Sequence, residues 1–258
     1  MRGLIRALKR AAPPNSSRTR LLWETERFAK SLPPGSMVLD AGCGDSPYRE
    51  LFAHVRYESA DFKQVPGATY DNAITHVCDL RAIPVEDSRY DFLLFHQVME
   101  HLPDPCAVLA ELHRVLKPGG KILYSAPLFY EPHQEPYDFY RYTSHGVEHL
   151  FKGAGFTIDW LDWLEGYYGT VAYQMSRMAQ YLPARPASIA TGVGGLLLAP
   201  WMVLLKAQMA ACSLFFHWLE TKSKFTAAGY PKNYIAIVAK PPVRLAFDFQ
   251  ATTNNDGG

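Results

Sequence analysis

The sequence is poor in cysteine and lacks the ligand spacing of a metal site. Its four cysteines, at positions 43, 78, 106 and 212, form no CxxC pair, and its nine histidines show no HExxH or comparable motif. A disulfide scaffold and a structural zinc site are therefore both disfavoured, and we predict no bound metal. Scattered free thiols are typical of a reducing compartment, so a cytoplasmic protein is expected.

An excess of charge of either sign is also missing. The chain has 26 Lys and Arg residues against 25 Asp and Glu, a formal net charge of +1. It therefore lacks the broad basic field of a nucleic-acid-binding protein, and no NPPY-type tetrapeptide is present to grip a flipped base. No nucleic-acid partner is expected. The apolar fraction of 48% predicts one ordinary globular domain with an appendage.

The two ends of the chain differ from its body. Residues 1–20 carry six cations and no acid, and residues 243–258 form a polar tail. The first segment has no continuous apolar core, so it is not a secretory signal. Two interpretations stay open: a frayed basic arm, or a short helix over 1–12 that lies on an anionic membrane surface at the inner face of the membrane.

The body of the chain alternates short apolar runs with amphipathic stretches. This alternation predicts a doubly wound α/β fold with a parallel sheet. We assign residues 21–165 to the core and 233–242 to its last strand. The predicted strands cover 37–42, 56–61, 75–80, 90–97, 121–127, 156–164 and 233–240, and the predicted helices cover 46–53, 105–116 and 145–156.

The first predicted strand runs into two glycines one residue apart. Gly42 and Gly44 let the backbone turn sharply and approach a ligand closely, and Asp40 stands beside that turn. Asp61 ends the second predicted strand, where a carboxylate accepts hydrogen bonds from ribose hydroxyls. Asp45 would repel a pyrophosphate but is harmless to a cationic sulfonium. These residues therefore favour S-adenosylmethionine over a nicotinamide dinucleotide.

Five motifs follow one another in order between residues 38 and 127. They are VLDAGCGDS (38–46), Asp61, CDL (78–80), YDFLLFHQVMEHLPDP (90–105) and LKPGGKILYSAP (116–127). Together they resemble the class I S-adenosylmethionine-dependent methyltransferases of the type 11 group, over about residues 35–165. The resemblance implies a Rossmann-like sheet of seven strands whose last strand is antiparallel. The chain departs from the family at Ser46, where a third glycine is usual. A serine costs little there if φ stays negative, although it could narrow the pocket.

The resemblance also implies which residues hold the cofactor. The methionine part would meet Asp40 and the turn Gly42, Cys43 and Gly44. The ribose would be held by Asp61, the adenine amino group by Asp79 and the adenine ring by Leu80, while His96 and Gln97 would close the pocket.

Methyl transfer to a hydroxyl requires an aligned acceptor and a base that takes its proton. The candidates lie in the loop 127–143, which is too polar for a core segment and too aromatic for a simple linker. His133 is the first candidate for the base, with Tyr137, Asp138 and Arg141 beside it. The alternative is a structural loop in which Asp138 and Arg141 form a local ion pair and the tyrosines pack beneath.

A second candidate is His101 of the Glu100-His101 pair, which in the family frequently has a structural role. The motif HxxPxDFYRYT (133–143) resembles a subgroup of methyltransferases encoded with bacterial polysaccharide and glycosyltransferase genes. This resemblance implies a saccharide or lipid-linked saccharide acceptor.

Residues 166–232 form an insertion before the last strand, with helical spacing over 171–183. Residues 186–205 carry no charge, Lys206 interrupts, and 207–219 are again uncharged. A spanning helix needs about 20 apolar residues. Three interpretations stay open: buried cap helices or a homodimer face, an interfacial or re-entrant membrane contact through 186–219, and a true membrane span.

Four functions are compatible with these features. The first is methylation of a glycan or glycolipid hydroxyl, and the second is methylation of a small lipophilic acceptor such as a quinone precursor or a fatty acid. The third, a nicotinamide-dependent oxidoreductase, is disfavoured by Asp45 and the missing third glycine. The fourth is a non-catalytic module that keeps the fold and the cofactor pocket. The polar loop 127–143 favours the first.

Overall fold

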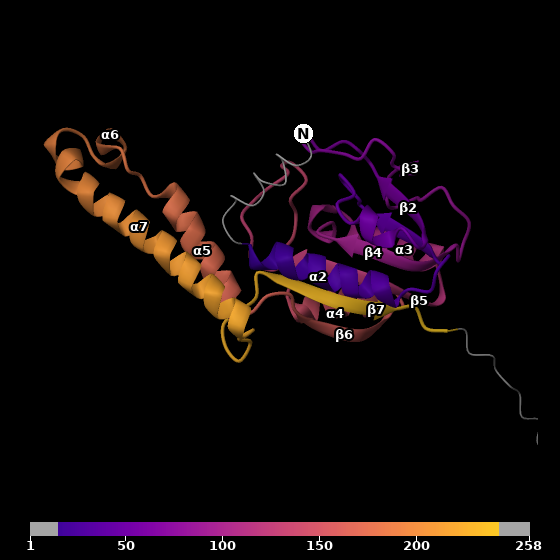
Figure 1. The fold of residues 1–258 in the computed structure, drawn as a ribbon. Coiled ribbons are helices and arrows are strands. Elements are labelled where there is room, and N and C mark those ends of the chain that lie inside the picture. Colours follow the sequence, from indigo (N-terminus) through magenta and orange to yellow (C-terminus); the bar gives the residue numbers. More distant parts are fainter. Residues whose placement is uncertain (1–14, 243–258) are drawn as a thin grey trace, which may run out of the picture.

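The computed structural model describes residues 15–242, so the proposed membrane helix over 1–12 and the tail 243–258 lie outside the described residues. Within that range the chain forms a seven-stranded sheet with helices on both faces and a long helical hairpin that extends away from it (Figure 1). The strands are β1 (Met37–Ala41), β2 (Arg56–Asp61), β3 (His76–Val77), β4 (Tyr90–His96), β5 (Leu116–Pro127), β6 (Thr157–Trp163) and β7 (Asn233–Ala239).

The strand order is β3-β2-β1-β4-β5-β7-β6. Strands β1 to β5 pair in parallel, and β7 lies antiparallel between β5 and β6. The chain order reverses between β1 and β4, which places the turn after β1 and the turn after β4 on either side of one crevice. The predicted α/β fold, with seven strands and an antiparallel last strand, is therefore confirmed.

Two helices cover the face of the sheet on which most of the core packs. They are α3 (Pro105–Val115), capped by Asp104, and α4 (Ser144–Gly153), capped by Thr143. Leu109, Leu112 and Phe151 are fully buried there against the sheet. The apolar spacing of 105–116 and 145–156 predicted both helices, and their polar caps fix where each begins.

The opposite face is covered by α2 (Ser16–Ser31), which the sequence analysis did not predict. Asn15 caps it by accepting the Arg18 N–H, and Phe28 packs edge-on against Phe92 of β4. The helix begins inside the segment that we assigned to the basic arm. Thr25 lies on the buried face of α2, where its hydroxyl donates to the carbonyl of Leu21 at 2.7 Å. Because a polar residue stands at this buried position, the apolar spacing of a helix is not evident in the sequence.

Three local predictions differ from the structure. A 3₁₀ turn, η1 (Arg49–Phe52), replaces the helix predicted over 46–53, because Ser46 lies at φ 50° and Pro47 follows it. The third strand has two residues where six were predicted. Strand β5 begins at Leu116, so its first residues occupy the turn expected at 117–120. Its pairing with β4 changes register between Tyr90 and Phe92.

The insertion forms the hairpin, made of α5 (Tyr167–Tyr181), the single turn α6 (Pro186–Ile189) and α7 (Val193–Lys222). Figure 1 shows it in orange, projecting from the sheet. Only 6% of the most apolar 18-residue stretch of α7 is buried, which contradicts the interpretation of the insertion as buried cap helices. Among the described residues α7 is the one helix long and apolar enough to cross a membrane, by length and composition.

A buried carboxylate anchors the base of this hairpin. Glu220 of α7 accepts the N–H groups of Gly166 and Gly169, at 2.9 and 3.1 Å, where α5 begins. It also pairs with Arg20 of α2 at 2.7 Å. A carboxylate is favourable at a helix N-terminus, where unpaired N–H groups point outward. The hairpin is therefore fixed to the core at its base, while its far end is free of the sheet.

Candidate active site

A large cavity lies at the carboxyl ends of β1, β2 and β4. Its volume is about 990 Å³, which is large enough for a nucleoside ligand. Eight predicted site residues line it: Gly42, Gly44, Asp61, Asp79, Leu80, Gln97, His101 and Tyr137. Residues 64–70 after β2 form a further wall of this cavity that was not predicted, although Pro66-Gly67 was the available signal of a loop.

The glycine turn is closely packed against the strand-four turn. Gly42 has φ +78°, and a Cβ there would lie 2.4 Å from a Val98 methyl carbon. Gly44, at φ +51°, donates its N–H to Asp61 Oδ2 at 3.0 Å. Only glycine fits Gly42, because the conformation is left-handed and the space is filled. Ser46 stands where the family usually has a third glycine. Its φ is 50°, so the backbone is left-handed there, and the condition of a negative φ under which a serine costs little is not met.

Asp61 holds the turn and also faces the cavity. Its Oδ1 accepts the Lys63 N–H at 3.0 Å, while Oδ2 takes the Gly44 contact. Each oxygen keeps a further lone pair for a ligand hydroxyl, since a carboxylate can accept about four hydrogen bonds. The side chain is therefore suited to a ribose diol, as the sequence predicts.

Asp79 and Leu80 line the same cavity just after β3, whose Val77 pairs with Asp61. Leu80 is buried, but the Asp79 carboxylate is about half exposed and forms a two-pronged ion pair with Arg81 at 2.7 Å. This contact holds the pKa of Asp79 below its usual range. An adenine amino group would share the Asp79 carboxylate with Arg81, whereas Leu80 offers an apolar surface to a ring.

Three predicted cofactor residues lie outside the cavity lining. Asp40 accepts the Tyr57 hydroxyl at 2.5 Å, and burial raises the pKa of its carboxyl to about 6. Cys43 is buried within the turn. His96 lies 3.3 Å from the Thr25 hydroxyl of α2 and 3.1 Å from the Ser125 hydroxyl. Alternate residues of a strand face opposite sides, and this places His96 on the α2 side.

The loop 127–143 is docked onto the 3₁₀ turn η2 (Met99–His101) by its backbone. The carbonyl of Glu100 accepts the N–H groups of Phe139 and Tyr140, at 2.9 and 3.2 Å. The Tyr142 hydroxyl donates to the carbonyl of Met99 at 3.1 Å. These contacts bring together two segments that are about 40 residues apart in the chain.

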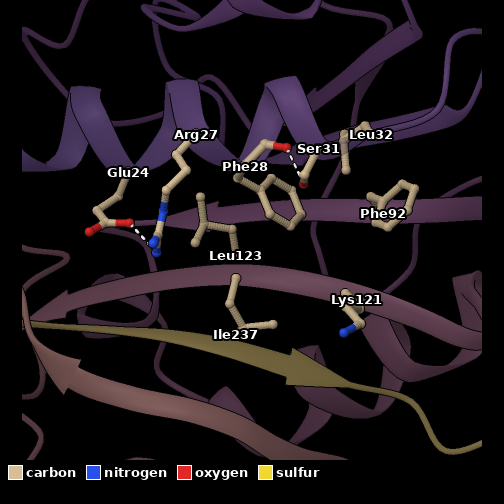
Figure 2. A pocket seen from close by; sticks show the side chains of 9 residues that line it. All are labelled: Glu24, Arg27, Phe28, Ser31, Leu32, Phe92, Lys121, Leu123 and Ile237. Carbon is tan, nitrogen blue, oxygen red and sulfur yellow. Dashed lines mark hydrogen bonds and ion pairs between the residues drawn. The ribbon is translucent and has the colours of Figure 1, made fainter.

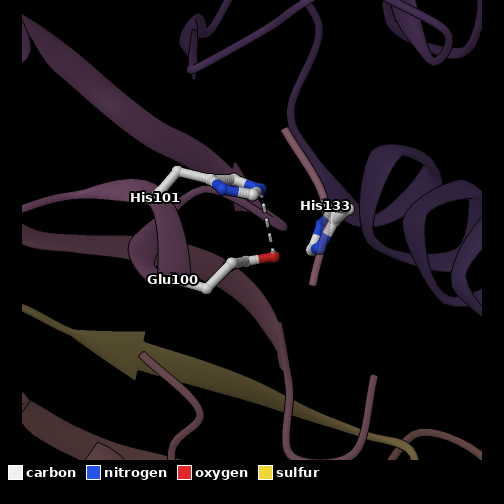
Figure 3. Close-up of side chains that lie close together, drawn as sticks. All are labelled: Glu100, His101 and His133. Carbon is white, nitrogen blue, oxygen red and sulfur yellow. Dashed lines mark ion pairs between the residues drawn. The ribbon is translucent and has the colours of Figure 1, made fainter. Parts of the chain in front are cut away.

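His101 and His133 meet at this junction. Their rings lie 4.7 Å apart, edge to face, and the His101 Nδ1–H donates to the Tyr137 carbonyl at 2.5 Å. Figure 3 shows both imidazoles turned toward the carboxyl group of Glu100. His101 lines the cavity and His133 lies behind it, so the two candidates for the base are in contact.

Asp138 and Arg141 form the ion pair that the sequence left as an alternative. Arg141 donates to both carboxylate oxygens, at 2.6 and 2.9 Å, and Asp138 Oδ2 also accepts the backbone N–H of His133 at 2.9 Å. The guanidinium holds the pKa of Asp138 at about 2. Since Arg141 also donates to the carbonyls of Tyr130 and Glu131, the pair fixes the backbone around His133.

Glu100, His101 and His133 include the residue types that bind transition metals. One donor atom from each lies within 4.8 Å of the others, and the His101 Nε2 to Glu100 Oε1 distance is 3.8 Å. Motif spacing could not indicate this cluster, because His133 comes from a different segment. The absence of a metal stays a prediction of the sequence, and metal analysis of the purified protein checks it.

Glu100 itself is fully buried, and neither carboxyl oxygen has a hydrogen-bond partner among the described residues. Burial raises the pKa of this carboxyl to about 8. The carboxyl is therefore protonated near neutral pH, since an unpaired buried charge is costly.

Replacing Glu100 by glutamine should change how stability depends on pH. A raised pKa contributes stability that is present below the ordinary value of 4.5 and is lost as pH rises through about 8. Glutamine cannot ionise, so relative to the native protein the variant should gain about 2–3 kcal/mol between pH 6 and pH 9. Urea unfolding at both pH values measures this gain. If the native protein and the variant differ in unfolding free energy by the same amount at both pH values, Glu100 is not protonated in the folded state.

A second cavity, of about 480 Å³, lies between α2 and the sheet (Figure 2). Its floor is apolar, with Phe92, Leu123 and Ile237, and Glu24 and Arg27 pair at its rim. It contains none of the predicted site residues. It also lies away from the turns at the carboxyl ends of β1 and β4, where open α/β sheets bind ligands. We therefore place the site in the first cavity.

Comparison with known proteins decides the family. Residues 15–160, more than half of the chain, match the family described as "Methyltransferase domain". The chain belongs to this methyltransferase family. The methyltransferase identity and the S-adenosylmethionine cofactor predicted from residues 38–127 are thereby confirmed at the level of the family.

Curated relatives resemble this methyltransferase over its core. A probable S-adenosylmethionine-dependent methyltransferase of Mycolicibacterium smegmatis is 31% identical over 143 residues, which are 48% of this chain and 53% of that protein. A ubiquinone biosynthesis O-methyltransferase of Pseudomonas savastanoi is 29% identical over 119 residues, 41% of this chain and 49% of that protein. The chain thus spans about half the length of these relatives.

Solved structures share the fold at low identity. A phosphoethanolamine N-methyltransferase of Haemonchus contortus, in complex with S-adenosylhomocysteine, aligns with a TM-score of 0.51 and 16% identity, over 86% of this chain and 52% of that chain. The cyclase SpnF aligns with the same TM-score and 17% identity, over 84% and 81% of the two chains. The fold alone therefore does not specify the reaction.

Proposed function

We propose that this methyltransferase transfers a methyl group from S-adenosylmethionine to a hydroxyl oxygen of a saccharide or lipid-linked saccharide. The observation that carries the proposal is the contact between His101, on the cofactor cavity, and His133, on the aromatic and polar loop 127–143. This contact places a potential proton acceptor beside the cavity. Tyrosine rings on the same loop suit a sugar face, and polar side chains suit its hydroxyls.

We assign the cofactor contacts to the predicted residues that line the cavity. Asp61 holds the ribose, Leu80 covers the adenine ring and Asp79 accepts from its amino group. Gly42 and Gly44 admit the methionine part, with Gln97 opposite. S-adenosylmethionine supplies the methyl group when bound. Asp40, Cys43 and His96 support the turns from behind, since they do not line the cavity.

His133 takes the proton of the acceptor hydroxyl. Its Nδ1 faces the Glu131 carbonyl at 3.2 Å and Asp138 Oδ2 at 3.8 Å, which leaves Nε2 to accept. Burial lowers the pKa of this imidazole, so it is neutral near pH 7. Asp138 and Arg141 hold the loop backbone, while His101 and Tyr137 close the cavity next to it.

The hairpin supports a lipid-linked acceptor. Glu131, two residues before His133, accepts the Tyr173 hydroxyl of α5 at 2.8 Å and pairs with Arg177 at 2.5 Å. Tyr130 stacks on Tyr173 and also touches the His133 ring at 4.8 Å. The loop that carries the proposed base is therefore attached to the hairpin, and we propose membrane contact through 1–12 and 186–219 at the inner face of the membrane.

A small lipophilic acceptor is the second candidate. The relatives include enzymes named for ubiquinone biosynthesis and for O-methylation of malonyl-[acyl-carrier protein]. The apolar α7 would serve such an acceptor equally well. A radiolabelled methyl-transfer assay separates the two candidates: labelling of lipid-linked saccharide supports the first, and labelling of a quinone precursor alone supports the second.

Calorimetric titration with S-adenosylhomocysteine tests the cofactor assignment, with NADH as the control. We expect micromolar binding of S-adenosylhomocysteine and none of NADH. If neither ligand binds, the chain keeps the fold without the activity, and the non-catalytic module becomes the better interpretation.

A further inference from the structure

Beyond its base, where Glu220 is buried, the hairpin combines an apolar surface with charge of one sign. Residues 166–219 contain Arg177, Arg185 and Lys206 but no Asp or Glu. The exposed large apolar side chains of α7, here called the apolar arc, extend from Val193 to Trp218 and include Leu196, Leu197, Trp201, Leu204 and Phe215. An apolar surface with basic and no acidic residues is the composition of a segment that binds an anionic lipid surface.

The apolar arc is too broad for a single protein contact. At 100° per residue, its exposed positions spread over about 220° of the helix circumference. A helix that packs on one partner uses a stripe of about 100°. A second copy of the chain would therefore leave much of the arc in water, whereas acyl chains cover all of it.

Two of the three cations, Arg185 and Lys206, lie on the side of α7 opposite the apolar arc, while Arg177 of α5 pairs with Glu131. Lys206 Nζ donates to the carbonyls of Gln180 and Leu182, at 3.1 Å each, where α5 ends. Arg185 immediately precedes α6, which packs against α7 at Gly195. Gly195 and Ser213 mark the buried side of α7, and both lie roughly opposite the centre of the apolar arc on a helical wheel.

We propose that α7 lies in the plane of an anionic membrane surface. Its apolar arc is immersed in the acyl chains, while α5, α6, Arg185 and Lys206 remain at the level of the headgroups. An upright insertion is disfavoured because it would carry Arg185, near the tip, into hydrocarbon. This orientation deepens the membrane contact of the proposed function and is independent of the acceptor.

The depths of two tryptophans test the orientation. Trp201 and Trp218 are 69% and 53% exposed on the apolar arc and stand about 25 Å apart along the helix axis. With the full chain on phosphatidylglycerol–phosphatidylcholine vesicles, fluorescence quenching by brominated lipids is compared among the native protein, Trp201→Phe and Trp218→Phe. In-plane binding predicts that the two substitutions remove equal shares of the quenching by shallow bromines. Quenching of Trp201 by deep bromines, with Trp218 unquenched, would overturn the proposal.

Vesicle flotation of surface variants tests the lipid contact itself. Leu197→Asn combined with Leu204→Asn should lower partitioning on the order of 100-fold, because two exposed leucines lose their burial in lipid. Ser188→Asn combined with Thr191→Asn, on exposed polar positions of the same tip, is the matched control and should partition like the native protein.

The outcomes separate the two levels of the proposal. Binding to vesicles with unequal tryptophan depths keeps the membrane contact and rejects the in-plane orientation. A native protein that stays in the supernatant and sediments as a dimer rejects both, and shows that a second copy covers the arc. Methyl transfer is measured separately, so loss of activity in solution would not be read as failure of membrane binding.

Discussion

Replacing His133 by alanine should lower the turnover of methyl transfer by about 10²–10⁴-fold, the range that a positioned general base contributes. Affinity for S-adenosylhomocysteine should be unchanged, because His133 lies behind His101 and does not line the cofactor cavity. Steady-state turnover with a saturating acceptor and calorimetric titration of the cofactor product measure the two quantities.

Two control variants distinguish a base from a structural ring. His149→Ala removes an exposed imidazole of α4 and should leave turnover at the native level. His101→Ala changes the cavity lining, so it should weaken cofactor binding as well as turnover. Full turnover in His133→Ala would remove His133 from the mechanism and leave His101 as the remaining candidate.

The same assignment predicts a direction for the pH profile. A base must be neutral to accept a proton, and burial holds the pKa of His133 below its ordinary value of 6.5. On the acidic side of the profile, activity should therefore fall as the pH drops below the ordinary imidazole range. This acidic limb should be absent from the residual activity of His133→Ala.

The central strands β1, β4 and β5 were predictable because each contains a short apolar run that ends at a turn. The motifs at the carboxyl ends of the strands predicted the edge of the sheet at which the cofactor cavity lies. The contact between His101 and His133 was not predictable, since it depends on backbone hydrogen bonds from the loop 127–143 to the carbonyl of Glu100. Sequence spacing carries no record of such docking. The apolar insertion was predicted from the sequence, but its projecting hairpin was not. An apolar run has the same pattern whether its side chains are buried or exposed.

The position of His96 illustrates a further limit of sequence reasoning. It follows Phe95 on β4 and precedes the turn at Gln97, so a one-residue difference decides which side of the sheet it faces. The resemblance grouped His96 with Gln97 as closing the pocket. In the structure Gln97 lines the cavity, whereas His96 contacts Thr25 and Ser125, and burial lowers the pKa of its ring to about 3.

Asp61→Ala should weaken cofactor binding by about 1–3 kcal/mol, which is a 5- to 150-fold rise in the dissociation constant. Part of the loss is direct, because two ribose hydroxyls would lose their acceptor. The rest is indirect, because the carboxylate also accepts the N–H groups of Gly44 and Lys63, which hold the glycine turn. Calorimetric titration with S-adenosylhomocysteine measures the total.

Asp61→Asn separates the two contributions. The asparagine side chain keeps one oxygen that can accept the Gly44 N–H, so this part of the turn should persist. The Lys63 N–H loses its acceptor, and the ribose loses one of its two acceptor oxygens. Binding by this variant should therefore lie between that of the native protein and that of Asp61→Ala. Asp159→Ala, which breaks only the surface pair with Lys121, is the charge-matched control and should bind like the native protein. If Asp61→Ala leaves the dissociation constant unchanged, the ribose assignment is wrong. Among residues 15–242, Asp61 is the one carboxylate lining the cavity that accepts an N–H of the glycine turn, so no equivalent group is present to replace it.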